Sequence, residues 1–152
     1  MKYMILATAL ISTAIFANDV YLIGGGFSKH FKSGNQNETH PSFGIQVDNM
    51  SVIYVQSNSI ESKSVQVSYS DNFYESEYVD IGYRFGLASG YKKGTHFGEN
   101  NVYSGTSFEL GNSGIIPIVA AEFSFHTPIP NFDLVIDVIP TVAMFGFKYR
   151  IE

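Results

Sequence analysis

Residues 79–91, VDIGYRFGLASGY, alternate large apolar side chains with small or charged ones. Side chains of a β-strand point alternately to its two faces, so this pattern predicts a strand with one bulky apolar face and one cramped face. A soluble sandwich buries its apolar face and carries sizeable polar side chains on the other. A narrow barrel in a bilayer does the reverse: bulky residues face lipid, and small or polar residues fit the lumen. The bulky residues here are Val79, Ile81, Tyr83, Phe85 and Leu87, and the second face holds Asp80, Gly82, Arg84, Gly86 and Ala88.

The same alternation recurs in seven further segments, 20–31, 41–48, 51–57, 63–70, 115–125, 132–139 and 141–152, of which 51–57 is the least regular. In the first, we expect Tyr21, Ile23 and Phe27 on the outer face and Gly24, Gly26, Ser28 and His30 in the lumen. No segment after the N-terminal apolar run shows a helical period. The pattern predicts an all-β fold, an eight-stranded antiparallel up-and-down transmembrane β-barrel. The alternative is an exported, soluble eight-stranded barrel or sandwich.

The charged residues of the cramped faces would lie together inside such a barrel. We expect them to pair with one another in the lumen, where they are withdrawn from water: Asp80, Arg84, Glu122, Asp137 and Lys148. Asp48-Asn49 is a candidate tight turn. The long polar segment 92–114 is a candidate loop, with a small extra hairpin over 101–110.

The first residues have the layout of a secretory signal peptide, with a Lys at position 2, an apolar run and small residues near Ala17. We therefore assign residues 1–17 to a signal peptide and 18–152 to a single barrel domain; an uncleaved N-terminal anchor is the alternative. Cysteine is absent and the net charge is −5, so neither disulfides nor nucleic-acid binding are expected. A signal peptide ahead of a barrel predicts the outer membrane of a bacterial cell.

Two pieces near strand ends could carry chemistry. FSKHF contains His30, and YVQSNSIES contains Asn58 and Ser59. If the Asp48-Asn49 turn lies at one end of the barrel, both pieces lie at the other. A Ser hydroxyl becomes a nucleophile when an imidazole takes its proton and a third group orients that imidazole. The His residues lie far apart without metal-type spacing, so we expect neither a metal nor another cofactor.

The order of motifs resembles the lipid A palmitoyltransferase (PagP) family of outer-membrane barrels and their PagP-like relatives. The resemblance rests on FSKHF, NETHPSFGI (37–45), IYVQSNS (53–59), YVDIGYRFGLASGY (78–91), IIPIVAA (115–121) and VIP (138–140). It implies an eight-stranded barrel with an acyl-chain pocket inside. It also implies transfer of a fatty acyl chain from a phospholipid to lipid A. We expect these membrane lipids to be the partners and the protein to be monomeric.

The same resemblance implies roles for individual residues. His30 matches the family's catalytic His, and Asn58-Ser59 matches its Asp-Ser pair, with Asn58 in place of the acidic residue. Pro117 and Pro140 match prolines that open lateral gaps for lipid, because Pro cannot donate to a β-ladder. Two alternatives stay open: a non-enzymatic small barrel for surface protection, adhesion or scaffolding, and a lipid A deacylase, whose His-x-Ser-Asn motif has no match here.

Overall fold

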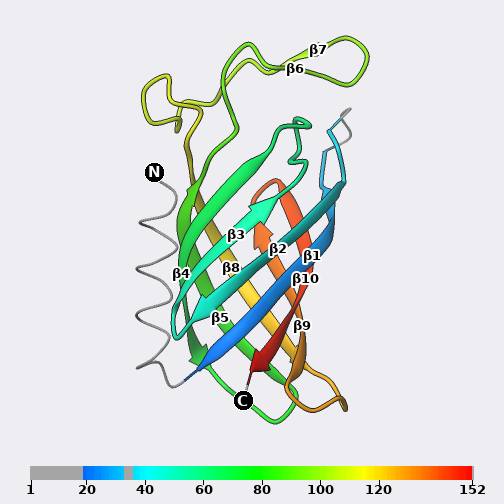
Figure 1. The fold of residues 1–152 in the computed structure, drawn as a ribbon, viewed down its shortest axis with the longest axis vertical. Coiled ribbons are helices and arrows are strands. Elements are labelled where there is room, and N and C mark those ends of the chain that lie inside the picture. Colours follow the sequence, from blue (N-terminus) through cyan, green and yellow to red (C-terminus); the bar gives the residue numbers. More distant parts are fainter. Residues whose placement is uncertain (1–18, 33–35, 152) are drawn as a thin grey trace.

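The computed structural model describes residues 19–32 and 36–151, and they form a closed antiparallel barrel (Figure 1). The predicted eight-stranded up-and-down topology is confirmed, since the strand order around the barrel is β1-β10-β9-β8-β5-β4-β3-β2. The expected signal peptide, residues 1–17, lies outside the described part. None of the described residues belongs to a helix long and apolar enough to cross a membrane. The barrel strands are β1 (Val20–His30), β2 (Thr39–Val47), β3 (Met50–Val55), β4 (Ser64–Tyr74), β5 (Val79–Ala88), β8 (Ile116–His126), β9 (Phe132–Ile139) and β10 (Val142–Ile151).

The two ends of the barrel differ. The turn end holds the short connections 48–49, 75–78 and 127–131, and Asp48 adopts the positive φ of 49° that a tight turn requires there. The loop end holds the connection 56–63 and the long excursion 89–115 (top of Figure 1). Within that excursion β6 (His96–Phe97) pairs with β7 (Asn101–Val102), so the extra hairpin lies earlier than the predicted 101–110. β1 and β3 both finish at the loop end, as the Asp48-Asn49 turn predicted.

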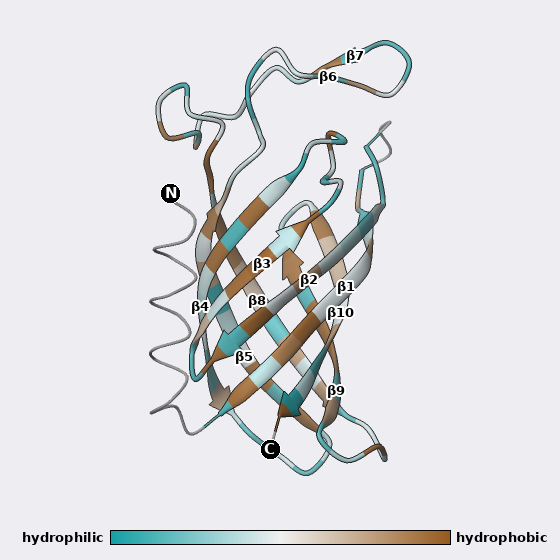
Figure 2. Cartoon of the chain, viewed as in Figure 1, coloured by the Kyte–Doolittle hydropathy of each residue, from teal (hydrophilic) through white to brown (hydrophobic). Residues whose placement is uncertain are grey.

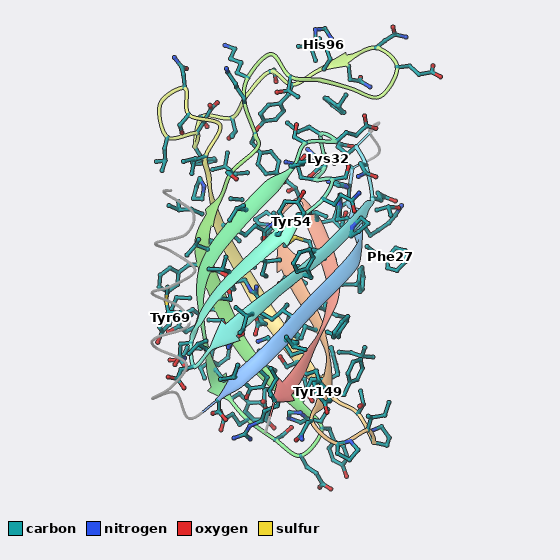
Figure 3. The ribbon with its side chains drawn as sticks, in the orientation of Figure 1. Phe27, Lys32, Tyr54, Tyr69, His96 and Tyr149 are labelled. Carbon is teal, nitrogen blue, oxygen red and sulfur yellow. The ribbon has the colours of Figure 1, made fainter. Side chains whose placement is uncertain are left out.

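The outer face of the barrel is apolar, and the alternation predicted for residues 79–88 is confirmed. Tyr83, Phe85 and Leu87 are exposed, whereas Gly82, Arg84 and Ala88 are buried in the lumen. Brown and teal alternate along the strands in Figure 2, and Phe27 projects away from the barrel in Figure 3. The structure describes every residue of the eight barrel strands. Among them, only two charged residues point outward: Lys29 near the loop end and Asp71 towards the turn end.

The first strand departs from the prediction. The register between β1 and β10 shifts by one residue between Gly25 and Phe27, because Gly26 is an extra, bulged residue of β1. A shift of one residue exchanges the two faces of a strand. The placement of Tyr21 and Ile23 on the outer face was therefore wrong: Ile23 is buried in the lumen, and Tyr21 lines its turn end.

Gly24 was predicted to be lumenal but faces outward, beneath the ring of Phe147. A Cβ atom at position 24 would lie only 2.4 Å from that ring, so the close packing requires glycine. Beyond the slip, Ser28 and His30 face the lumen as predicted. The irregular β3 also points Ile53 and Val55 inward, so the lumen contains an apolar cluster with Ile23.

Four charged side chains cross the middle of the lumen, and we name Arg84, Glu122, Asp137 and Lys148 the charge layer. Arg84 donates from Nε and a terminal nitrogen to Glu122 Oε2, at 2.8 and 2.6 Å. Lys148 Nζ donates to the other oxygen of Glu122, and Arg84 Nε lies 3.4 Å from Asp137 Oδ2. Two cations and two carboxylates balance in charge, and the predicted pairing is confirmed. Asp80 lies apart, nearer the turn end, where it contacts His126 at 3.2 Å.

Removal of the central carboxylate should destabilise the barrel strongly. Glu122→Ala leaves Arg84 and Lys148 buried without their main partner, at a cost of about 3–5 kcal/mol in the free energy of unfolding. A urea titration of the refolded barrel in detergent micelles measures this loss. The control is Glu99→Ala, which removes an exposed carboxylate of the long excursion and should leave the unfolding midpoint almost unchanged. Equal midpoints for the two variants would contradict the structural role of the charge layer.

Candidate functional site

The charge layer divides the interior into two cavities of opposite character. The loop-end cavity has a volume of about 260 Å³, and Arg84 and Asp137 form its floor. The turn-end cavity has a volume of about 460 Å³, and Glu122 and Lys148 lie at its inner end. The turn-end cavity is polar, with Asp19, Asp48, Glu75, Asp80 and Asp133 in its wall. The wall of the loop-end cavity is mostly apolar and includes Ile23, Ile53, Val55, Ala88, Ile116, Ile118, Val135, Ile139 and Val142.

The β-ladder that forms the barrel wall is interrupted beside the loop-end cavity, and we name this interruption the gap. β8 pairs with β5 as far as Ile116, opposite Ala88. On its other side, the ladder between β8 and β9 stops at Ala121, opposite Val138. Residues 116–120 therefore have no strand partner on the β9 side. The gap lies between the segments that contain Pro117 and Pro140, and Ile116, Pro117, Ile118 and Ile139 also line the cavity.

The predicted catalytic residues His30, Asn58 and Ser59 all line this cavity, but no hydrogen bond joins any two of these three described residues. His30 Nδ1 is buried without a hydrogen-bond partner, and the nearest carboxylate oxygen, Glu38 Oε1, is 3.9 Å away. Glu38 instead accepts the backbone N–H of His30 and the Lys29 ammonium. These two contacts, the backbone one first, lower the pKa of Glu38. His30 therefore lines the cavity with one buried ring nitrogen that makes no hydrogen bond to the described residues.

Asn58 is occupied in shaping the connection 56–63. Its Oδ1 accepts the backbone N–H groups of Ile60 and Ser62, each at 3.0 Å, and its Nδ2 donates to the carbonyl of Gly90 at 3.2 Å. The side chain is almost wholly buried, at 2 % exposure. An amide supplies both the acceptor and the donor that these partners need, whereas a carboxylate supplies only the acceptor. The Asn at this position therefore suits the loop better than an acid would.

Ser59 pairs with a tyrosine rather than with an imidazole. Its Oγ lies 3.3 Å from the Tyr91 hydroxyl, which comes from the start of the long excursion. Burial raises the pKa of Tyr91, and the hydrogen bond with Ser59 lowers it by less. The tyrosine therefore keeps its proton at neutral pH, and the pair ties the 56–63 connection to residue 91.

A serine–histidine contact that the sequence analysis missed lies in the same cavity. Ser28 Oγ is 2.6 Å from His40 Nε2, and His40 Nδ1 is 2.9 Å from the backbone carbonyl oxygen of Ser57. Ser28 comes from β1 and His40 from β2, and both line the cavity. The available signal was the position of Ser28 in FSKHF, on the same lumenal face as His30. Its partner could not be found from spacing, because the slip at Gly26 also shifts the pairing of β1 with β2.

No group of His, Cys, Asp or Glu within the described part of the chain has the arrangement needed to hold a metal ion. Above the floor of Arg84 and Asp137, the polar side chains that line the loop-end cavity include hydroxyl, imidazole and amide groups. Comparison of the sequence with known protein families finds no family model that matches, and comparison with curated proteins finds no relative.

Replacement of Asn58 by the acid should weaken the barrel's loop end. In Asn58→Asp, a carboxylate oxygen replaces the amide nitrogen that donates to Gly90, so two acceptors face each other and about 1–3 kcal/mol of unfolding free energy is lost. Urea titration measures the loss, and limited proteolysis reports the loosening of 56–63. Asn112→Asp, at an exposed position of the long excursion, is the control and should change neither. A fully stable Asn58→Asp barrel would show that the amide donor is dispensable.

Proposed function

We propose that this chain is an outer-membrane β-barrel that takes a fatty acyl chain of a membrane lipid into its loop-end cavity, as a step of acyl transfer between lipids. The observation that carries the proposal is a narrow apolar cavity closed by charge at its inner end and adjoining a gap in the barrel wall. A chain entering by the gap would keep its ester group near the polar residues at the loop end. Its tail would lie against the apolar wall.

The outer surface supports a place in a membrane. Large apolar side chains are exposed around the barrel, among them Phe27 and Phe43 at 67 % and 69 % and Val119 at 70 %. Soluble monomers rarely expose apolar patches larger than a few hundred Å². A bilayer would cover this belt, and barrel closure satisfies the backbone groups that lipid cannot. The named site residues lie towards the loop end, so the long excursion would face the outside of the cell.

The size of the cavity suits a single chain. At about 260 Å³ it lies just below the range of roughly 300–1,000 Å³ that is usual for small-molecule sites. The charge layer blocks further entry, because burying a methylene chain among desolvated ion pairs would separate their charges. The cavity would therefore limit the length of chain that enters.

Transfer of the chain to lipid A is the activity that the resemblance to the PagP family suggests, with His30 and Ser59 as its reactive pair. Both residues line the cavity, and the buried Nδ1 of His30 makes no hydrogen bond that a lipid ester would have to displace. A second candidate function is a barrel that works only through its long excursion. Phe108 is 71 % exposed there and Leu110 53 %, which would suit contact with another surface.

An obstruction in the cavity should abolish acyl-chain binding. Ala88 is 2 % exposed and lines the cavity, so Ala88→Phe would fill the space that the chain needs. A phospholipid with a photoreactive group at the end of its acyl chain should cross-link to the lumenal wall of the wild-type barrel, as peptide mass spectrometry can map. We expect the lumenal cross-link to be lost in Ala88→Phe and kept in Ala121→Phe, which adds the same ring to the outer face. Cross-links confined to outward residues would contradict the proposal that the acyl chain enters the cavity.

Acyl transfer is tested separately in cells. The protein should be expressed in a bacterial outer membrane and the lipid A analysed by mass spectrometry. A gain of one acyl chain would support the transfer, and His30→Ala and Ser59→Ala would show whether those residues are needed. Unchanged lipid A beside a folded barrel would favour the second candidate.

A further inference from the structure

The contact between Ser28 and His40 has the geometry of a nucleophile and its base. A backbone carbonyl can only accept a hydrogen bond, so the 2.9 Å contact with Ser57 O requires a proton on His40 Nδ1. In the neutral imidazole Nε2 is then unprotonated, and it accepts the hydroxyl proton of Ser28 across 2.6 Å. One carbonyl thus fixes the tautomer and the ring orientation, which are the tasks of the third member of a catalytic triad.

The surroundings of Ser28 match that geometry. The residue is 5 % exposed, yet it lines the loop-end cavity, so its hydroxyl meets the cavity rather than bulk water. His30 lies two residues further along the same face and offers a buried Nδ1 that has no partner among the described residues. A carbonyl oxygen that develops negative charge near Ser28 would find this imidazole on the same wall.

We infer that Ser28 is an acyl-accepting nucleophile and His40 its general base, acting on a long-chain carboxylic ester whose tail occupies the loop-end cavity. The inference rests on the proposed function and deepens it: it assigns the nucleophile and base to Ser28 and His40 in place of Ser59 and His30, the pair that the resemblance suggests. Ser28 Oγ bonds to the ester carbonyl carbon as its proton passes to His40 Nε2. The carbon–oxygen bond to the alcohol then breaks, and that alcohol leaves with the proton from His40. An acceptor hydroxyl, from a second lipid or from water, next gives its proton to His40 and bonds to the carbonyl carbon of the Ser28 ester. The bond between that carbon and Ser28 Oγ then breaks, and His40 returns the proton to Ser28 Oγ.

A covalent probe tests this step. A hexadecyl fluorophosphonate should react with the refolded barrel in detergent: Ser28 Oγ bonds to phosphorus, fluoride leaves, and the serine proton passes to His40. Peptide mass spectrometry should find the adduct on Ser28. We expect labelling to be lost in Ser28→Ala and slowed about 100-fold or more in His40→Ala, in line with general-base catalysis. The matched control is Ser68→Ala, which should label like the wild type. It removes a lumenal hydroxyl whose hydrogen-bond partner within residues 19–32 and 36–151 is Ser51 alone.

A second pair of variants tests the base without relying on the loss of a signal. The natural sequence contains no cysteine, so a thiol introduced at position 28 is the only one that can react. Ser28→Cys places a single thiol beside His40, and its alkylation by iodoacetamide at neutral pH should be at least 10-fold faster than in the Ser28→Cys, His40→Ala double variant. Equal rates would overturn the role of His40 as base. Circular dichroism confirms that each variant is folded.

The outcomes separate the two proposals. An unlabelled Ser28 in a folded barrel overturns the inference, and the contact with His40 then only ties β1 to β2 and the 56–63 connection. Labelling of Ser59 in place of Ser28 overturns it as well and assigns the nucleophile to Ser59. Whether a photoreactive phospholipid cross-links inside the lumen decides the proposed function on its own, since binding of the chain needs no reactive serine.

Discussion

Closure of the sheet by β1 and β10 is the constraint on which the rest of the structure depends. Pairing along the whole of β1, from Val20 opposite Ile151 to His30 opposite Val142, leaves no free edge at the seam. Once the sheet is closed, every side chain of a strand lies either outside or inside a narrow tube. The outside can then be uniformly apolar, and all polar chemistry is collected in the lumen. The cavities, the charge layer and the serine–histidine contact all follow from this sorting.

The charge layer determines how the lumen is used. Glycine and serine on the cramped face would leave a continuous channel, and the ion pairs around Glu122 interrupt it. Apolar residues from β1 and β3 make the loop-end cavity hydrophobic, while carboxylates make the turn-end cavity polar. A compartment with an apolar wall, a charged floor and a lateral gap is suited to one end of a lipid rather than to a soluble solute. The ion pairs of this layer join β5, β8, β9 and β10, so the division of the lumen is part of the fold.

The sequence was sufficient for the architecture, because alternation determines the two faces of β5, β8, β9 and β10 directly. It was insufficient where register changes. The extra residue Gly26 turned Tyr21 and Ile23 inward, and no composition signal distinguishes a bulged glycine from a lumenal one. Spacing brought His30, Asn58 and Ser59 to the correct end, but hydrogen bonding decides what each side chain does. Asn58 is engaged by its own loop, and the contact of Ser28 with His40 depends on a diagonal alignment of two strands that the bulge sets.

The interruption at mid-lumen also bears on permeability. In a bilayer, a tube plugged by Arg84, Glu122, Asp137 and Lys148 would conduct neither ions nor nutrients, because each permeant molecule would first have to break a buried salt bridge. A cell could therefore accumulate many copies of this barrel without leakage. Such a protein differs from a porin, whose abundance sets how freely solutes cross.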